Sequence, residues 1–368
     1  MKTARETALM ILYKTEYEGA YPNIELKNAI PSQMPQNDRA LVTALVYGVI
    51  SKKLTLDYII EQNSKIKLKK ISKYIHQILR MGIYQILFMD KIPSSAAVNE
   101  SVKLAKRYGH GASAGFVNGI LRTVLRSGVE YPNLSVKYSF PEWICKKWIN
   151  DFGEEFTEQM MKSFEEPPEL IIRPNRLKIT AEELRQRLND CGVVTEIING
   201  RIACKGLNIG KNEFYKQGFY TVQDTAAMTA VEVLAPKSGE TVIDMCAAPG
   251  GKTTYIAELM NNEGEIYAFD IYEHKIKLIN DSAKRLGIDI IKAKTGNAAV
   301  YNERLDGKAD KILCDVPCSG LGILRRKPDI KWNRKEDDNF SDIQLEILNN
   351  AARYLKNSGS ILYSTCTV

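Results

Sequence analysis

The sequence predicts a multidomain protein that begins with an all-α bundle, continues with a small α+β subdomain and ends with an α/β domain on a parallel sheet. Three observations carry this prediction. Apolar residues recur at helical spacing through residues 3–126, short strand-like runs follow between residues 169 and 203, and strands alternate with helices from about residue 219. A chain of 368 residues is long enough for two or three separate cores.

The charge distribution separates the first third of the chain from the rest. Residues 1–126 contain 19 Lys and Arg against 9 Asp and Glu, a net charge of +10, so the whole-chain value of +7 leaves −3 for the remaining 242 residues. A basic module joined to a near-neutral one is typical of a polyanion-binding domain attached to another activity. For either lysine cluster alone, at residues 65–73 or 103–107, a solvated basic face is an equally good interpretation.

The first module, expected over residues 1–128, is divided by proline and glycine into roughly six or seven helices. Four of its stretches resemble the NusB-like RNA-binding domain, which implies RNA as a partner. These stretches are D-R-A-L-V-T-A-L-V-Y-G-V-I from Asp38, L-R-M-G-I-Y-Q-I-L-F from Leu79, A-A-V-N-E-S-V-K-L-A-K from Ala96 and F-V-N-G-I-L-R from Phe116.

The second module, expected over residues 129–218, starts near a stretch without periodicity at residues 127–139, which looks like a linker because it carries Gly, Pro and Asn. Helices are predicted next, from 141 through 148 and from 154 to 164. Strand-like runs follow at 169–173, 193–198 and 201–203, with a helix over 181–191 between the first two. The pattern resembles a small RRM-like subdomain that lacks the RRM stacking signature.

The third module, expected over residues 219–368, is predicted to be a Rossmann-like α/β domain with helices on both faces of its sheet. Its predicted helices cover residues 252–260, a segment ending at 286, and 342–355. Its predicted strands are 241–243, 265–269, 288–293, 311–314 and 360–363.

Composition excludes several classes of protein. No apolar run approaches the ~20 residues of a membrane span, and the first residues lack the features of a signal peptide, so we expect a cytoplasmic protein without a membrane partner. Seven scattered cysteines and three histidines argue against a disulfide framework and against a metal site. The cysteines are therefore reduced thiols available for chemistry, and a monomer is the default expectation.

The segment Asp315 to Gly322, D-V-P-C-S-G-L-G, follows an apolar strand and cannot continue as helix or central strand because of its proline and glycines. Cys318 should therefore lie on a loop at the carboxyl end of a strand, where open α/β sheets bind ligands. Taken alone, a buried structural cysteine is the more common interpretation.

The turn Asp244 to Lys252, D-M-C-A-A-P-G-G-K, joins the first strand of this sheet to its first helix. Gly250 and Gly251 allow the backbone to approach a ligand, and the helix start offers unpaired N–H groups. The next strand ends at Asp270, where an acid accepts both hydroxyls of an adenosine ribose. Turn and acid indicate a nucleoside-bearing cofactor and leave NAD and S-adenosylmethionine both open.

Three loops taken together decide between NAD and S-adenosylmethionine as the cofactor. C-A-A-P-G-G-K-T from Cys246, D-V-P-C-S-G-L-G from Asp315 followed by R-R-K-P-D-I-K-W from Arg325, and S-T-C-T-V from Ser364 are similar to motifs I, IV and VI of the RNA cytosine-5 methyltransferases. With the NusB-like module, the chain resembles the Sun/Fmu (RsmB) family, a resemblance that covers essentially all of it. It implies a class I fold, S-adenosylmethionine as cofactor and 16S ribosomal RNA as substrate.

The resemblance also implies roles for individual residues. Cys366 would add to C6 of cytosine as a thiolate, Cys318 would assist release of the product and Asp315 would hydrogen-bond the base. Lys252 could depress a thiolate pKa, touch the nucleotide or be a solvated helix-start lysine. The cofactor contacts carried over are Cys246, Ala247, Ala248, Pro249, Gly250, Gly251, Lys252, Asp270, Asn297 and Asp315.

Two further features bear on binding. Asn297 stands where the family usually has an acidic residue near the adenine, so we expect a weaker adenine contact. A basic stretch with one aromatic follows the Pro-Cys loop, and it is expected to contact phosphates and a base drawn out of the RNA. Its residues are Arg325, Arg326, Lys327, Lys331 and Trp332.

Two rival functions stay open at this point. The chain ends at Val368, two residues after Cys366, so the catalytic domain looks truncated relative to its family and an inactive RNA-binding protein is one alternative. A DNA cytosine-5 methyltransferase is the other. It would use Cys318 as nucleophile, but it explains neither the basic helical module nor the Thr365-Cys366 pair.

Overall fold

The computed structural model describes residues 2–31 and 33–368 and divides into two compact units. The first unit comprises Met1–Pro167 and Ile323–Glu336, and the second comprises Pro168–Gly322 and Asp337–Val368. The chain therefore leaves the second unit after the Pro-Cys loop, enters the first and returns.

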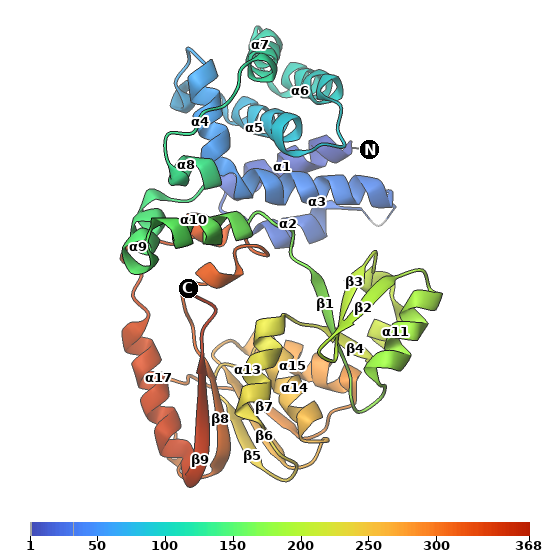
Figure 1. The fold of residues 1–368 in the computed structure, drawn as a ribbon, viewed down its shortest axis with the longest axis vertical. Coiled ribbons are helices and arrows are strands. Elements are labelled where there is room, and N and C mark those ends of the chain that lie inside the picture. The colour runs from blue at the N-terminus through green and yellow to red at the C-terminus, as the bar shows by residue number, and fades with distance from the viewer. Residues whose placement is uncertain (1, 32) are drawn as a thin grey trace. The chain divides into compact units, whose positions relative to one another are not determined.

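The first unit is helical, which confirms the predicted all-α bundle (Figure 1). Leu9, Leu45, Leu56, Ile78 and Leu121, from five different helices, are fully buried in its core. The helices are α1 (Ala4–Tyr17), α2 (Pro22–Ala29), α3 (Gln36–Ser51), α4 (Lys53–Asn63), α5 (Lys73–Phe88), α6 (Ser94–Tyr108), α7 (Ser113–Arg126), α8 (Leu134–Tyr138), α9 (Glu142–Phe152) and α10 (Glu154–Ser163).

The segment expected to be a linker contains the short helix α8, so that part of the prediction was wrong. Asn133 caps its first turn by accepting a hydrogen bond from the Val136 N–H at 2.9 Å. The Thr55 hydroxyl of α4 donates to the Val136 carbonyl at 2.5 Å, and the Ser139 hydroxyl oxygen accepts from the Leu54 N–H at 2.9 Å. Tertiary hydrogen bonds thus order a stretch that lacks helical periodicity.

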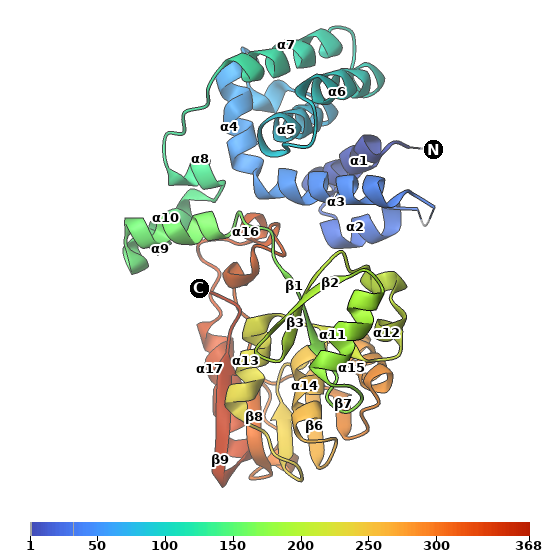
Figure 2. The same ribbon diagram turned by 45° about the vertical axis from the view of Figure 1, so that its right-hand side comes forward.

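The inserted segment Ile323–Glu336 carries α16 (Ile330–Asn333), which packs within the helical unit (Figure 2). The Trp332 ring packs against the core of the bundle, and its indole N–H donates to the Ile50 carbonyl at 2.7 Å. The Lys331 ammonium donates to the Ser51 carbonyl at 2.8 Å.

The second unit begins with a small sheet in the order β2-β3-β1-β4. Its neighbouring strands run antiparallel, and Ile172, Leu184 and Ile202 form its core with α11. The elements are β1 (Leu170–Pro174), α11 (Ala181–Asp190), β2 (Val194–Ile198), β3 (Arg201–Lys205), α12 (Glu213–Lys216) and β4 (Tyr220–Val222). This confirms the predicted small α+β subdomain.

A parallel sheet in the order β7-β6-β5-β8-β9 forms the rest of the second unit and confirms the predicted α/β fold. Its elements are α13 (Thr225–Leu234), β5 (Thr241–Asp244), α14 (Gly251–Leu259), β6 (Glu265–Asp270), α15 (Glu273–Leu286), β7 (Ile291–Thr295), β8 (Ala309–Asp315), α17 (Ser341–Tyr354) and β9 (Leu355–Ser364). Helices α13, α14 and α15 cover one face and α17 covers the other (Figure 1).

The strand order reverses at β5, which pairs with β6 on one side and with β8 on the other. β5 is followed by α14 on one face of the sheet and β8 leads to α17 on the other, so the carboxyl edge between them is the place where open α/β sheets bind ligands. The sheet thus places the turn after β5 beside the Pro-Cys loop after β8.

Candidate active site

Four neighbouring strands end in polar residues at this edge of the sheet. Asp244, Asp270 and Asp315 are the last residues of β5, β6 and β8, and Ser364 is the last residue of β9. Asp315 is the register partner of Ser364. The parallel arrangement therefore gathers carboxylates from distant parts of the sequence.

The predicted cofactor turn leads from β5 into α14. The Ala247 N–H donates to the Phe269 carbonyl at 2.7 Å, which ties the turn to β6, and the Gly250 N–H donates to the Ala247 carbonyl at 2.8 Å. Gly250 has φ +99°, a left-handed conformation that favours glycine, and a Cβ there would make a tight contact of 3.2 Å with the Ile279 Cα. The next residue begins α14, whose first N–H groups lie beside the turn.

Cys246 lies within this turn but is not a reactive thiol. Burial raises the pKa of its side chain to about 12. Its expected contact with a cofactor is therefore an apolar or backbone one.

Asp244 is a residue of this site to which the sequence reasoning gave no role. Its side chain is buried, and Oδ2 accepts a hydrogen bond from the Thr253 hydroxyl at 2.7 Å while Oδ1 has no partner. Burial raises the pKa of this carboxyl to about 7. The available signal was its place as the acid that ends the strand before the glycine turn.

Asp270 and Asn297 lie at the ends of β6 and β7. Asp270 Oδ1 accepts from the Tyr272 N–H at 3.0 Å, and the carboxylate is mostly buried. Asn297 is exposed, and its side-chain oxygen accepts from the Ala299 N–H at 3.0 Å, so one lone pair is already used. The expected adenine contact would have to use the other.

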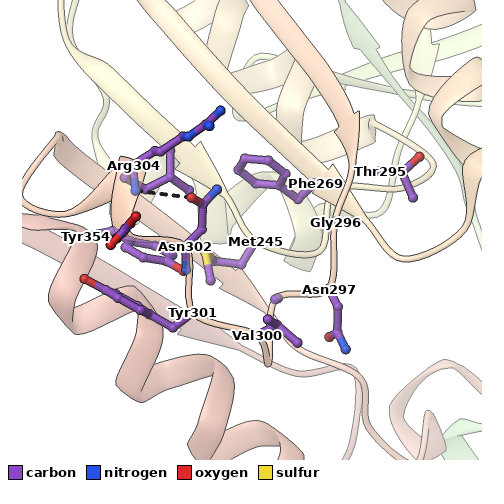
Figure 3. A pocket seen from close by; sticks show the side chains of 13 residues that line it. Met245, Phe269, Thr295, Gly296, Asn297, Val300, Tyr301, Asn302, Arg304 and Tyr354 are labelled. Atoms are coloured by element: carbon purple, nitrogen blue, oxygen red, sulfur yellow. Dashed lines mark hydrogen bonds between the residues drawn. The ribbon is translucent and has the colours of Figure 1, made fainter.

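A pocket of about 550 Å³ opens beside Asn297 (Figure 3). Met245, Phe269 and Tyr354 line it on the sheet and α17 side, and the connection from β7 to β8 lines the rest. Figure 3 shows Phe269 and Asn297 on this lining, with the Arg304 N–H bonded to the Asn302 side chain. The pocket adjoins the strand ends that are expected to hold an adenosine.

Asp315 is held on both of its oxygens. Lys252, in the first turn of α14, places its ammonium 2.5 Å from Oδ2, and the Ser364 hydroxyl donates to Oδ1 at 2.9 Å. Lys252 thus bonds Asp315 directly, which the sequence did not predict. Ser364, also missed, is the first residue of the S-T-C-T-V stretch.

Cys318 and Cys366 meet at the same place. Their sulfur atoms lie 3.0 Å apart, and the Cys366 N–H donates to the Cys318 sulfur at 3.2 Å. The Gly322 N–H donates to the Cys366 carbonyl at 2.9 Å, and a Cβ at Gly322 would lie 2.9 Å from that carbonyl oxygen. The glycine therefore permits the two loops to run side by side.

The two thiols titrate as a coupled pair because their sulfur atoms are hydrogen-bonded to each other. The pKa of Cys318 is lowered to about 6 because Cys366 donates its S–H and backbone N–H groups of Gly320 and Cys366 donate as well. The pKa of Cys366 is raised, since it is the donor and would ionise beside a thiolate. The hydrogen bond therefore favours the thiolate on Cys318 over the thiolate on Cys366, and Cys366 is the exposed member of the pair.

The basic stretch after the Pro-Cys loop is divided between two surroundings. Arg325, Arg326 and Lys327 are exposed, and the Arg325 guanidinium also donates to the Glu166 and Pro167 carbonyls at 3.1 Å. Lys331 is 3% exposed, and burial lowers its pKa to about 7. RNA contact by these residues stays a prediction, and the structure gives Lys331 and Trp332 a packing role.

Residues 2–31 and 33–368 contain no group of three His, Cys, Asp or Glu side chains placed to hold a metal ion. Among the same residues, every helix is too short or too polar to cross a bilayer.

Three family models match the chain in the order of its modules. They are the NusB family over residues 2–126, the ferredoxin-like domain of RsmF/B-like methyltransferases over residues 140–209, and 16S rRNA methyltransferase RsmB/F over residues 231–368.

Curated relatives match nearly the whole chain. It is 39% identical to the probable ribosomal RNA small subunit methyltransferase B of Bacillus subtilis, covering 100% of this chain and 85% of the relative. It is 34% identical to the protein of the same name from Synechocystis, covering 100% and 86%. It is 33% identical to the ribosomal RNA small subunit methyltransferase B of Photorhabdus laumondii, covering 92% of this chain and 81% of the relative.

Solved structures also resemble this chain. The crystal structure of PH0851 covers 100% of this chain and 87% of its own, with a TM-score of 0.79 and 28% identity. The structure of a methyltransferase homologue from Pyrococcus horikoshii covers 65% of this chain and 78% of its own, with a TM-score of 0.55 and 29% identity.

Proposed function

Because the chain belongs to the 16S rRNA methyltransferase RsmB/F family, we propose that it methylates C5 of a cytosine in 16S ribosomal RNA through a covalent cysteine adduct. It is an RNA methyltransferase that depends on S-adenosylmethionine. The observation that carries the finer proposal is the contact between the Cys318 and Cys366 sulfurs beside the Lys252–Asp315 pair.

The residues at the strand ends fit S-adenosylmethionine, which supplies an electrophilic methyl group when bound. Asp244 offers a buried carboxyl oxygen without a partner, which favours a nearby cation. The start of α14 offers unpaired N–H groups for a carboxylate. Asp270 ends the next strand at the distance along the chain where a ribose is held.

The chemistry of cytosine explains why a cysteine is needed. C5 is a poor nucleophile, so a sulfur must first add to C6. Cys366 is the exposed thiol, and as its sulfur bonds to C6 its proton passes to N3 of the base, which leaves a neutral enamine. Asp315, held by Lys252 and Ser364, accepts a hydrogen bond from the amino edge of the cytosine.

Cys318 is suited to the second half of the reaction. Once C5 carries the methyl group, the Cys318 thiolate takes the C5 proton, the C5–C6 double bond forms and the C6–S bond to Cys366 breaks. The Cys366 thiolate recovers the N3 proton, so one proton per turnover remains on Cys318 and is then released. A Cys318 pKa of about 6 returns this group to the thiolate at neutral pH.

The low pKa of Cys318 also favours a second assignment, in which Cys318 attacks C6 and Cys366 assists release. This is the arrangement of the DNA cytosine-5 alternative. Both assignments use the same pair of thiols, and they differ in which variant accumulates the adduct.

The test uses labelled S-adenosylmethionine with free 16S rRNA, small ribosomal subunits and duplex DNA. We expect no methyl transfer and no adduct in Cys366→Ala, and a covalent RNA adduct that survives denaturation in Cys318→Ala. Cys191→Ala is the matched control, since Cys191 is an exposed cysteine on the small subdomain.

Each alternative has its own outcome. An adduct in Cys366→Ala but not in Cys318→Ala would identify Cys318 as the nucleophile and Cys366 as the residue that assists release. Methyl transfer to DNA alone would show that the substrate is DNA and not RNA. RNA binding without transfer by the wild-type protein on either RNA substrate would favour the inactive RNA-binding alternative.

A further inference from the structure

Arg173 occupies an unusual position for a charged residue. Strand β1 alternates its faces, with Ile172 in the core of the small subdomain and Ile171 in the core shared with α13 and α14. Arg173 is 2% exposed and reaches α14. A buried guanidinium is tolerated only where its donors are satisfied, so its partners show what the residue does.

All five donors of Arg173 have acceptors, and most of these lie on α14. The Nη1 group donates to the Gly251 carbonyl at 3.0 Å and to the Gln223 side-chain oxygen. The Nη2 group donates to the Thr254 hydroxyl at 3.2 Å and to Glu258 Oε1 at 2.7 Å, and Nε donates to Glu258 Oε2 at 3.2 Å.

These bonds lead to the cofactor turn by two routes. The Gly251 carbonyl belongs to the first residue of α14, directly after the left-handed Gly250. Thr254, which accepts from Arg173, donates its own hydroxyl to the Gly250 carbonyl at 2.9 Å. Glu258, 1% exposed, anchors the guanidinium farther along the same helix.

We propose that Arg173 is a positioning residue that holds the start of α14 where its free N–H groups receive the carboxylate of the cofactor's amino-acid end. The proposal rests on the proposed use of S-adenosylmethionine. The small subdomain thus contributes to cofactor binding without touching the cofactor. Loss of Arg173 should weaken only the binding of the amino-acid end. The adenosine end is assigned to the ends of β6 and β7, which Arg173 does not contact.

Arg285 provides a matched control. It ties α15 to the same small subdomain by donating to the Tyr215 and Tyr220 carbonyls at 2.9 Å and to the Thr221 hydroxyl at 3.0 Å. None of these three bonds reaches α14. An Arg285→Lys change therefore weakens the attachment of the subdomain while leaving the cofactor turn in place.

The experiment measures binding of S-adenosylhomocysteine and of 5′-methylthioadenosine, which lacks the amino-acid end, by calorimetry on the full chain. In Arg173→Lys we expect the Kd of S-adenosylhomocysteine to rise by about tenfold, the equivalent of one charge-assisted hydrogen bond. The Kd of 5′-methylthioadenosine should change by less than about twofold, as should both values in Arg285→Lys.

Thr254→Val keeps the test decisive if Arg173→Lys does not fold, because it retains the arginine and removes the hydroxyl that links Arg173 to the Gly250 carbonyl. It should weaken S-adenosylhomocysteine selectively, and Thr254→Ser should restore the wild-type value. The proposal would be overturned if S-adenosylhomocysteine and 5′-methylthioadenosine lost affinity equally, or if neither Arg173→Lys nor Thr254→Val lost affinity. The proposed function would stand in either case. Failure of the wild-type protein to bind S-adenosylhomocysteine would instead contradict the proposed cofactor.

Discussion

Replacing Lys331 by methionine tests the insertion of residues 323–336 into the helical unit. The Lys331 ammonium donates to the Ser51 carbonyl and lies 4.2 Å from the centre of the Phe140 ring. Lys52 opposes its charge and Glu165 favours it, while burial is the largest influence on its pKa. Methionine has a similar length and carries no charge, so the variant removes the titration while largely preserving the packing.

The size and sign of the effect follow from the pKa. The folded value is about 7 against an ordinary value of 10.5, so the unfolded chain binds more protons between these two limits. Stability therefore rises with pH across that window. At 1.36 kcal/mol per pH unit, wild-type protein should gain about 2 kcal/mol relative to Lys331→Met between pH 7 and pH 9.

Urea unfolding followed by tryptophan fluorescence is the appropriate assay, because every tryptophan of the sequence belongs to the helical unit, at Trp143, Trp148 and Trp332. Lys327→Met, at an exposed lysine of the same segment, should follow the wild-type pH dependence. If Lys331→Met also followed it, the amine would be solvated and the reasoning from its burial would be refuted.

Three further substitutions give predictions with a defined direction. Because burial raises the Asp244 pKa to about 7, stability of the cofactor-free wild type should fall from pH 4 to pH 7, and Asp244→Asn should lose this dependence in thermal unfolding scans. The pKa of Asp57 is lowered to about 2 by His76 and Arg80, so Asp57→Asn should cost about 2 kcal/mol at pH 7 and progressively less below pH 4, measured by tryptophan fluorescence. Asn297→Asp should lower the Kd of S-adenosylhomocysteine by adding a second acceptor oxygen near the adenine, and an unchanged Kd would contradict the expected weak contact.

The fold was predictable because its main elements show strong periodicity. The runs ending at Asp244, Asp270 and Asp315 are strands in the structure, as their short apolar sequences and following turns predicted. The prediction missed α13, and it missed β4 and α8, which are short and are ordered by pairing with β1 and by bonds from Thr55. Local sequence carries little information on such tertiary contacts.

The basic stretch shows a different reason for incomplete prediction. A lysine beside a tryptophan is suited both to stacking on a nucleotide and to packing against a protein core, because each side chain combines apolar area with a donor. In the structure, Lys331 and Trp332 donate to the carbonyls of Ser51 and Ile50, at the end of α3. Contacts with residues 280 positions away in the sequence gave no signal in the local pattern.

The site residues were predictable in identity but not in their interactions. The motifs identified Cys318, Cys366, Asp315 and Lys252 separately, whereas the structure pairs them as two thiols and one ion pair. Pairing depends on the strand order, which places β8 between β5 and β9. The order cannot be obtained from the spacing of motifs along the chain.

The contact between the thiols gives a physical reason for the use of two cysteines. A single low-pKa thiolate cannot both remain bonded to C6 and remove the C5 proton, so a second group must hold the negative charge meanwhile. The hydrogen bond between Cys318 and Cys366 lowers the pKa of one sulfur while it keeps the other protonated. Cys366 therefore brings the proton that neutralises the adduct at N3, and Cys318 acts as the base. If the roles were exchanged, the attacking Cys318 thiolate would bring no proton, and the Cys366 thiol would have to supply it to N3 and then act as the base.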